Sequence, residues 1–157
     1  MKIGVMSDSH DNLPMIRRAL EVFKSAGAEC VVHAGDFIAP FAVREILKFP
    51  GPVHGCFGNN DGEKAGIRKL WPAVAEPPVR LTFGGRRLLL AHAPVDAPGG
   101  PDAPEVVISG HTHQLLVERK PGGPLLLNPG ETGGWLYGRA TVAVLDTGTL
   151  DVRIIDL

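Results

Sequence analysis

Residues 3–10 read Ile-Gly-Val-Met-Ser-Asp-Ser-His, an apolar run that ends in a carboxylate and an imidazole. The residues that follow predict a helix with Asp11 or Asn12 as its N-cap, because apolar side chains recur on one helical face. These side chains are Leu13, Ile16, Leu20 and Phe23. The pattern is typical of a buried strand that leads into a covering helix, with polar residues where the strand ends.

The same alternation continues along the first half of the chain. Residues 30–34 form a second apolar run, residues 41–49 have the periodicity of a helix, and residues 53–57 form a third apolar run before Gly58. Strands that are apolar on both faces are typical of a parallel sheet covered by helices. The first half therefore predicts two β-α-β units.

The second half of the chain predicts hairpins. Pairs of short apolar runs flank glycine-containing turns, at residues 79–83 and 87–91, 115–119 and 125–128, and 140–146 and 151–156. We expect these runs to form a largely antiparallel second sheet. Residues 94–104 contain four prolines and two glycines, which predicts an irregular surface loop.

Length and composition exclude several classes of protein. The chain of 157 residues has the size of one domain, so we expect residues 1–157 to form a single domain. Sixteen basic residues stand against seventeen acidic ones, which leaves no basic surface for duplex nucleic acid. Two cysteines without CxxC spacing predict no disulfide framework, and no apolar run is long enough for an export signal or a membrane span. We expect a cytoplasmic protein that does not act on membranes.

Polar segments stand where the predicted strands end. They are Asp8-Ser-His10, Gly35-Asp36, Gly58-Asn-Asn-Asp61, His92 and Gly110-His-Thr-His113. Each segment alone has an ordinary structural explanation, such as a helix cap or a turn. Because the carboxyl ends of strands in an α/β sheet meet in one crevice, we expect these segments to lie together.

The side chains in these segments form an oxygen and nitrogen donor set without cysteine. The candidate ligands are Asp8, His10, Asp36, Asn59, His92, His111 and His113. Such a set binds divalent manganese, iron, nickel or zinc. Seven ligands are too many for one tetrahedral structural zinc, but they suit two ions that share a carboxylate and activate water for hydrolysis. The residues therefore predict a dinuclear metal-dependent hydrolase.

The order and spacing of these motifs resemble the calcineurin-like metallophosphoesterase superfamily. The short chain and the sequence Asn128-Pro-Gly130 resemble its small bacterial and archaeal phosphodiesterases, and the resemblance runs from residue 1 to about residue 146. It implies an α/β fold, a four-layer α/β/β/α sandwich of two mixed β-sheets with flanking helices.

The resemblance also implies a role for each candidate residue. Asp8, His10 and His113 would hold one divalent ion, Asn59, His92 and His111 would hold a second, and Asp36 would bridge them. Mn²⁺ is the expected metal, with Ni²⁺, Fe²⁺ and Zn²⁺ as alternatives, and a bridging hydroxide would attack a small phosphodiester or nucleotide-like substrate. The implied catalytic residues are Asp36, Asn59 and His92, and the implied substrate-binding residues are Asn12, Asn59 and Asn60.

The sequence departs from the superfamily pattern at Asn60, where many members have a histidine. An amide cannot donate a proton as an acid, so we expect good leaving groups to be favoured. The residues after Asp36 lack the GDxxDRG motif of protein phosphatases, which argues against that activity. A phosphomonoesterase remains an alternative. A protein-interaction scaffold, like the retromer subunit of the same superfamily, is disfavoured because all seven ligand positions are filled.

Several other residues have simpler explanations. We expect His33 and His54 to be packed structural histidines. Trp71, Trp135 and Tyr137 could stack on a nucleobase, but ordinary packing is the simpler expectation. The sequence leaves open whether the protein forms a homo-oligomer, and also the role of the loop at residues 94–104.

Overall fold

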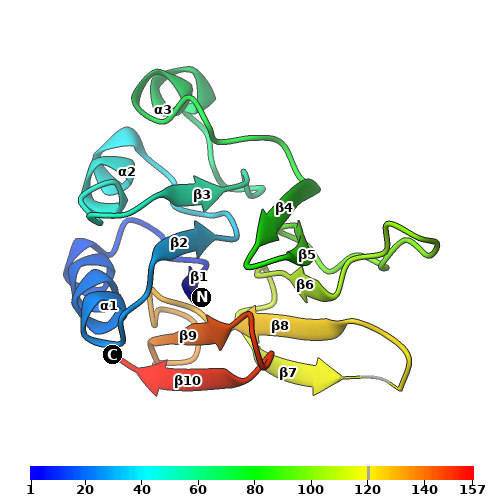
Figure 1. The fold of residues 1–157 in the computed structure, drawn as a ribbon. Helices are drawn as coiled ribbons and strands as arrows, with labels where there is room; N and C mark the ends of the chain where they lie inside the picture. Colours follow the sequence, from blue (N-terminus) through cyan, green and yellow to red (C-terminus); the bar gives the residue numbers. More distant parts are fainter. Residues whose placement is uncertain (120) are drawn as a thin grey trace.

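Two five-stranded sheets pack face to face in a computed structural model, which describes residues 1–119 and 121–157 (Figure 1). The first sheet has the strand order β10-β9-β1-β2-β3. Its strands are β1 (Lys2–Met6), β2 (Cys30–His33), β3 (Val53–Gly55), β9 (Thr141–Asp146) and β10 (Val152–Asp156). Strands β1, β2 and β3 are parallel, as the repeated alternation in the first half of the sequence predicts, and β9 is antiparallel to both β1 and β10.

The second sheet has the strand order β4-β5-β6-β8-β7. Its strands are β4 (Val79–Phe83), β5 (Arg86–Leu90), β6 (Val106–Ile108), β7 (Leu115–Arg119) and β8 (Leu125–Pro129). Strands β5, β6 and β8 are parallel to one another, and the edge strands β4 and β7 are antiparallel to their neighbours. The sheet is therefore mixed, and the expectation of a largely antiparallel second sheet is wrong.

The three predicted hairpins form, but the last one belongs to the first sheet. Strand β9 is buried along most of its length and pairs with β1 over Lys2–Val5, which places the β9–β10 hairpin at the edge of the parallel strands. A strand that is buried on both faces must lie inside a sandwich. This position explains why β9 belongs to the first sheet and not, as expected, to the second.

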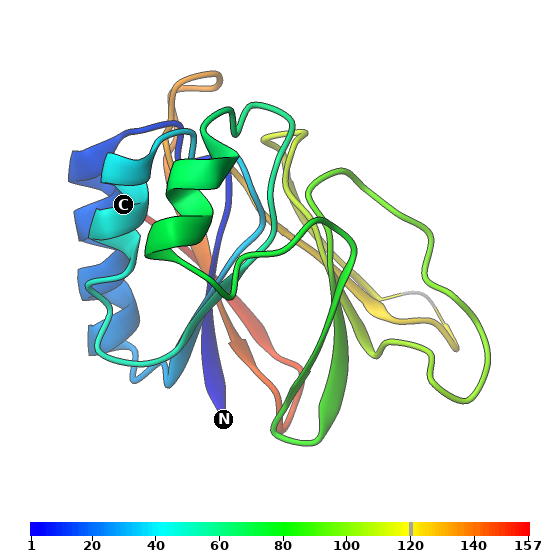
Figure 2. The same ribbon diagram turned by 90° about the horizontal axis from the view of Figure 1, so that it is seen from above.

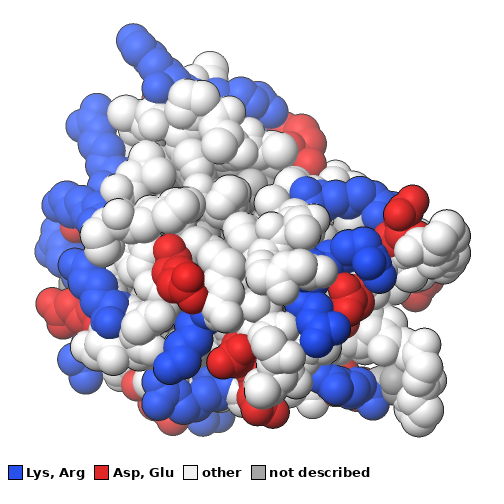
Figure 3. Space-filling model, viewed as in Figure 1, with Lys and Arg blue, Asp and Glu red and all other residues white. Residues whose placement is uncertain are grey.

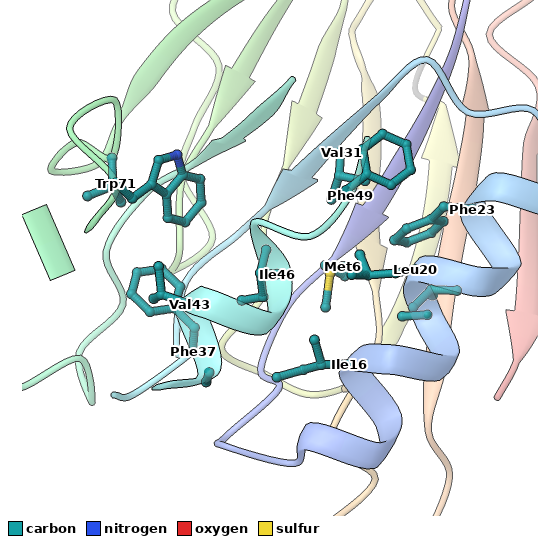
Figure 4. Packing of buried hydrophobic residues seen from close by; sticks show 14 of the residues in the cluster. Met6, Ile16, Leu20, Phe23, Val31, Phe37, Val43, Ile46, Phe49 and Trp71 are labelled. Carbon is teal, nitrogen blue, oxygen red and sulfur yellow. The ribbon is translucent and has the colours of Figure 1, made fainter. Parts of the chain in front are cut away.

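Three helices cover the outer face of the first sheet (Figure 2). They are α1 (Leu13–Ser25), α2 (Pro40–Ile46) and α3 (Lys64–Leu70). Their apolar side chains pack against the sheet in one cluster with Phe23, Phe37 and Trp71, part of which Figure 4 shows. Gly4 of β1 allows this close packing, because a Cβ there would lie 2.6 Å from the Phe23 ring.

The expected fold class, an α/β sandwich of two mixed sheets with flanking helices, is confirmed. One layer differs from the expectation. In the two described segments of the chain, all three helices flank the first sheet, and no helix flanks the second. Irregular chain around Pro94 and Val95 instead lies beside Val107 and Leu126 of the second sheet. The prolines in residues 94–104 account for this, because they disfavour a helix there.

Positive and negative side chains are interspersed on the face shown in Figure 3. Arg86 and Arg87, adjacent in the sequence, lie 2.7 and 3.7 Å from the carboxylate oxygens of Glu105. Glu105 therefore neutralises part of the positive charge of this adjacent arginine pair. Among the described residues, no helix has both the length and the apolar character needed to cross a bilayer.

We predict that Phe23→Ala destabilises the protein by about 3–5 kcal/mol, because it opens a cavity between α1 and β1. Phe23 is fully buried, whereas Phe41 of α2 is 49% exposed and provides a matched control. Urea unfolding followed by circular dichroism measures both variants. Equal unfolding midpoints for Phe23→Ala and Phe41→Ala would contradict this account of the core.

Candidate metal centre

The predicted ligand segments meet at one end of the sandwich. Asp8 and His10 follow β1, Asp36 follows β2, Asn59 follows β3, His92 follows β5, and His111 and His113 follow β6. Because β1–β3 are parallel in one sheet and β5 and β6 are parallel in the other, both sheets bring carboxyl ends of strands to this site. The loops that carry the ligands gather at the top of Figure 2.

The backbone at this end is strained. Five of the candidate ligands have a positive φ, which is uncommon for residues other than glycine. These residues are Asp8 (49°), His10 (40°), Asp36 (59°), His111 (65°) and His113 (60°). Such conformations cost about 1–3 kcal/mol each and persist only where the surrounding structure holds them, which is typical of functional sites.

Asp8, His10 and His113 form one group of converging ligand atoms. The Asp8 Oδ1 atom lies 3.5 Å from His113 Nε2 and 4.0 Å from His10 Nε2. The two histidine Nε2 atoms are 3.3 Å apart. All of these atoms lie within 4.8 Å of one another, which is the arrangement expected of three ligands to one ion.

Asn59, His92 and His111 form a second group. The Asn59 Oδ1 atom is 2.8 Å from His92 Nε2 and 2.9 Å from His111 Nδ1. One oxygen and two ring nitrogens therefore meet at a point beside the first group.

Asp36 lies between the two groups. Its Oδ2 atom is 3.7 Å from His10 Nε2 and 3.3 Å from His92 Nε2. Burial raises the pKa of Asp36, but the nearby His92 ring and the hydrogen bonds from Asn60 outweigh this effect, so the pKa falls well below its usual range. Asp36 is therefore ionised between two sets of candidate ligands.

Hydrogen bonds on the far side of two imidazole rings decide which nitrogen faces the site. The His92 Nδ1 atom lies 2.8 Å from the Ala34 carbonyl oxygen, and the His113 Nδ1 atom lies 2.8 Å from Glu131 Oε2. In each neutral ring the Nδ1–H then donates outward, which leaves the lone pair of Nε2 facing the cluster.

The arrangement suits cations. The lone pair of His92 Nε2 faces the oxygens of Asp36 and Asn59, so acceptors face acceptors unless a positive charge lies between them. The effect of Asp36 on His92 agrees with a preference for positive charge at this point. Burial lowers the pKa of His92, but the nearby Asp36 carboxylate outweighs burial and raises it. Burial also raises the pKa of Asp8, so a cation would stabilise its charged form. The donor set therefore fits divalent metal ions.

Two buried carboxylates, Asp61 and Glu131, support the cluster, and neither has a role in the sequence-based prediction. Asp61 accepts hydrogen bonds from the backbone N–H groups of Asp36, Ile38 and Gly58, at 3.0, 2.6 and 2.7 Å. Glu131 accepts the bond from His113 across 18 residues of sequence. Asp61 belongs to the polar segment Gly58-Asn-Asn-Asp61, which predicted that it lies near the ligands. The sequence around Glu131 contains no pattern that indicates its hydrogen bond with His113.

Two of the three asparagines predicted to bind substrate, Asn12 and Asn60, have side-chain amides that already have protein partners. Asn60 donates from its backbone N–H to Asp36 Oδ1 at 2.8 Å and from Nδ2 to Asp36 Oδ2 at 2.7 Å. Asn12 caps α1 by accepting from Met15 N–H at 3.4 Å, and its Nδ2 donates to the Gly133 carbonyl at 2.8 Å. Substrate binding by Asn12, Asn59 and Asn60 remains a prediction.

The two remaining histidines are structural, as expected. Burial lowers the pKa of His33 to about 3, so the ring is neutral, and its Nε2 lies 3.0 Å from Ser9 Oγ. His54 packs against the Phe83 ring.

The aromatic residues divide into two kinds. Trp71 is buried in the core, and its Nε1 donates to the Val53 carbonyl. Trp135 and Tyr137 are 65% and 55% exposed. The expectation of ordinary packing is therefore confirmed for Trp71 and wrong for Trp135 and Tyr137.

Comparison with known proteins places this site in context. A family model described as the calcineurin-like phosphoesterase superfamily domain matches residues 1–150. Phosphodiesterase MJ0936 of Methanocaldococcus jannaschii is 34% identical over 171 residues, which cover 100% of this chain and 99% of that protein. Phosphodiesterase YfcE of Escherichia coli strain K12 is 30% identical over 169 residues, which cover 97% of this chain and 91% of that protein. A solved structure described as a novel archaeal phosphodiesterase superposes with a TM-score of 0.87 at 32% identity and covers 100% of both chains.

We predict that Asp61→Asn lowers stability by about 1–3 kcal/mol, because an amide cannot accept all three N–H bonds. Since these bonds hold the backbone of Asp36, metal affinity should also fall by about 10–100-fold. Asp96→Asn in an exposed loop is the matched control. Urea unfolding and metal titration by calorimetry measure both effects, and unchanged metal affinity would contradict a supporting role for Asp61.

Proposed function

The chain belongs to the calcineurin-like phosphoesterase superfamily, and from this premise we propose that it is a phosphodiesterase with two divalent metal ions in the site. The observation that carries the proposal is the position of Asp36 between two groups of three ligands each. One carboxylate shared by two ions offsets the repulsion between them. A pair of ions about 3.5–4 Å apart is a common device for phosphoester hydrolysis.

Each group would hold one ion. Asp8, His10 and His113 would bind the first, Asn59, His92 and His111 the second, and Asp36 would bind both. When bound, the ions would supply an activated water and stabilise the charge that develops on the phosphoryl oxygens. Mn²⁺ is the proposed metal, because the donors are oxygen and imidazole without thiolate, and Ni²⁺, Fe²⁺ and Zn²⁺ are alternatives.

The residues of the chain keep the ligands in position before substrate binds. The Ala34 carbonyl orients His92, and Glu131 orients His113. Asp61 holds the backbone of Asp36, and Asn60 holds its side chain. Oriented ligands need little rearrangement during the reaction, which is how distant hydrogen bonds contribute to catalysis.

A small phosphodiester is the proposed substrate. The relatives MJ0936 and YfcE are both named phosphodiesterases, which favours diester over monoester hydrolysis. The complete donor set, with the Nε2 lone pairs of His92 and His113 turned inward, favours catalysis over a scaffold role. We further propose that residues 1–157 form one domain acting in the cytoplasm, where the buried free cysteines Cys30 and Cys56 stay reduced.

We predict that His111→Ala and Asn59→Ala each reduce the metal content from two ions to one per chain. Turnover of bis(p-nitrophenyl) phosphate should fall by more than about 100-fold, because even the outer partners of metal ligands contribute about 10–100-fold. Mass spectrometry of the bound metal and circular dichroism accompany the assay.

His54→Ala is the matched histidine control for these variants, since His54 packs against Phe83 away from the ligands. Full metal content and turnover in His111→Ala would overturn the assignment of the second ion.

We also predict a steep dependence of the rate on the pKa of the leaving group. Asn60 cannot act as an acid, and general acid catalysis contributes about 10²–10⁴-fold where it operates. Aryl diesters should therefore react much faster than alkyl diesters, and Asn60→His should flatten the slope if the ring reaches the leaving oxygen.

A linear free-energy plot over aryl and alkyl diesters, run for wild type and Asn60→His, measures the two slopes. Metal content is measured alongside, because Asn60 also bonds Asp36. A shallow slope for the wild type would mean that another group supplies the proton.

A further inference from the structure

A loop of three consecutive exposed apolar side chains lies between β8 and β9. Trp135, Leu136 and Tyr137 are 65%, 63% and 55% exposed. Single exposed apolar residues are common on protein surfaces, whereas a contiguous group marks a binding surface. In Figure 2 this loop, drawn in orange, rises at the same end of the sandwich as the loops that carry the metal ligands.

The loop is bonded to the backbone of the first ligand group. The Trp135 Nε1–H donates to the His10 carbonyl at 3.2 Å, and the Gly133 N–H donates to the Asp8 carbonyl at 3.0 Å. The Asn12 Nδ2 atom also donates to the Gly133 carbonyl, at 2.8 Å. The exposed indole of Trp135 therefore lies beside the metal centre and is fixed relative to it.

The phenol of Tyr137 is held next to another residue of the same group, His113. Its oxygen accepts a hydrogen bond from Gln114 Nε2 at 3.1 Å, and Gln114 directly follows His113. The polar atoms of both aromatic side chains are thus bonded to the chain, and much of each side chain stays open to solvent.

Glu131 joins the loop to a metal ligand. Its buried carboxylate accepts from the backbone N–H groups of Leu136 and Tyr137, at 3.0 and 2.6 Å, and bonds His113 at 2.8 Å. One carboxylate therefore positions both the aromatic loop and His113.

We propose that Trp135 and Tyr137 form a stacking surface for a nucleobase, which makes nucleotidyl phosphodiesters the substrate class of this site. This inference rests on the proposed function. A base on this surface would place its phosphate next to the ligands of the first ion, because the loop is bonded to His10 and lies beside His113. Rigid aromatic side chains give such contacts at little entropic cost.

The expected magnitude follows from base stacking on aromatic side chains. Removing such a contact weakens binding by about 5–150-fold. The effect should fall on KM for substrates that carry a base, since the contact is made away from the reacting phosphorus and is present before and during the reaction.

The kinetic test compares two diesters with the same leaving group, thymidine 5′-(p-nitrophenyl phosphate) and methyl p-nitrophenyl phosphate. Wild type should prefer the thymidine ester. Trp135→Ala and Tyr137→Ala should each reduce this preference by about 5–150-fold, mainly through KM. Trp135→Phe should retain most of it, and Phe41→Ala, a 49% exposed phenylalanine on α2, is the matched control. An unchanged preference in both alanine variants would overturn the proposal.

A binding test separates this surface from catalysis. Adenosine 5′-monophosphate should quench the fluorescence of exposed Trp135 in the wild type, and ribose 5-phosphate, which lacks the base, should not. The quenching should disappear in Trp135→Phe, because Trp71 is buried. Quenching by adenosine monophosphate without hydrolysis of any diester would reject the proposed function but retain the stacking surface.

Two other outcomes would reject the stacking surface. One is equal quenching by the nucleotide and the sugar phosphate. The other is a change of oligomeric state in Trp135→Ala, measured by sedimentation, together with an unchanged preference for the thymidine ester. That result would identify the loop as a contact between copies of the chain.

The role of Glu131 as a positioning residue is tested by Glu131→Gln. We expect it to lower both the metal affinity of the first ion and the preference for the thymidine ester, since the carboxylate serves His113 and the loop together. The variant Asp146→Asn, at the partly buried end of β9, is the control. A loss of metal affinity with an intact preference would show that Glu131 does not position the loop.

Discussion

The apolar layer between the two sheets is the constraint on which the site depends. Val5 and Val32 of the first sheet pack in one cluster with Leu90 and Ile108 of the second, and these strands lead directly into the ligand loops. The layer fixes the distance between ligands that belong to different sheets. Two hydrogen bonds then connect the strand ends of the two sheets. One joins His92 Nδ1 to the Ala34 carbonyl, and the other is donated by the His111 N–H to the Asp8 carboxylate. Gly35 lies at this junction because a Cβ there would come within 2.7 Å of His92 Nδ1.

The stability of the sandwich offsets the cost of its functional end. Several candidate ligands adopt left-handed backbone conformations, and Asp8 and Asp36 are buried close together. Each of these features opposes folding when taken alone. Asp61 compensates in part, because it satisfies three backbone N–H groups around Asp36. The site therefore exists because the core is strong enough to hold it, and bound cations would relieve much of the remaining electrostatic cost.

The sequence predicted elements where one residue pattern decides the structure. Apolar runs with helices between them identified β1 to β3, and glycine turns identified the hairpins. Helix α3 was missed because it is short, polar and buries only Ile67. Strand β6 was given no range, although a strand end was expected before Gly110, because its apolar run of three residues, Val106–Ile108, is short. The assignment of β9 to the first sheet depends on its pairing with β1, which lies more than 130 residues earlier in the sequence. Likewise, strand-end motifs predicted which candidate ligands come together, whereas the contacts of Glu131 and the exposure of Trp135 depend on the folded chain.

Glu131 links two properties that are separate in the sequence. As a proposed metal ligand, His113 would be constrained by the chemistry of the ion, whereas a surface loop is ordinarily free to change with the substrate. Because one carboxylate bonds the His113 ring and the amides of Leu136 and Tyr137, a change in loop conformation alters the orientation of the ligand. The loop can therefore change its exposed side chains, but it must keep the backbone geometry that Glu131 requires. On this fold, specificity can diverge through the side chains at 135 and 137 while the metal centre stays constant, which is how one scaffold serves different substrates.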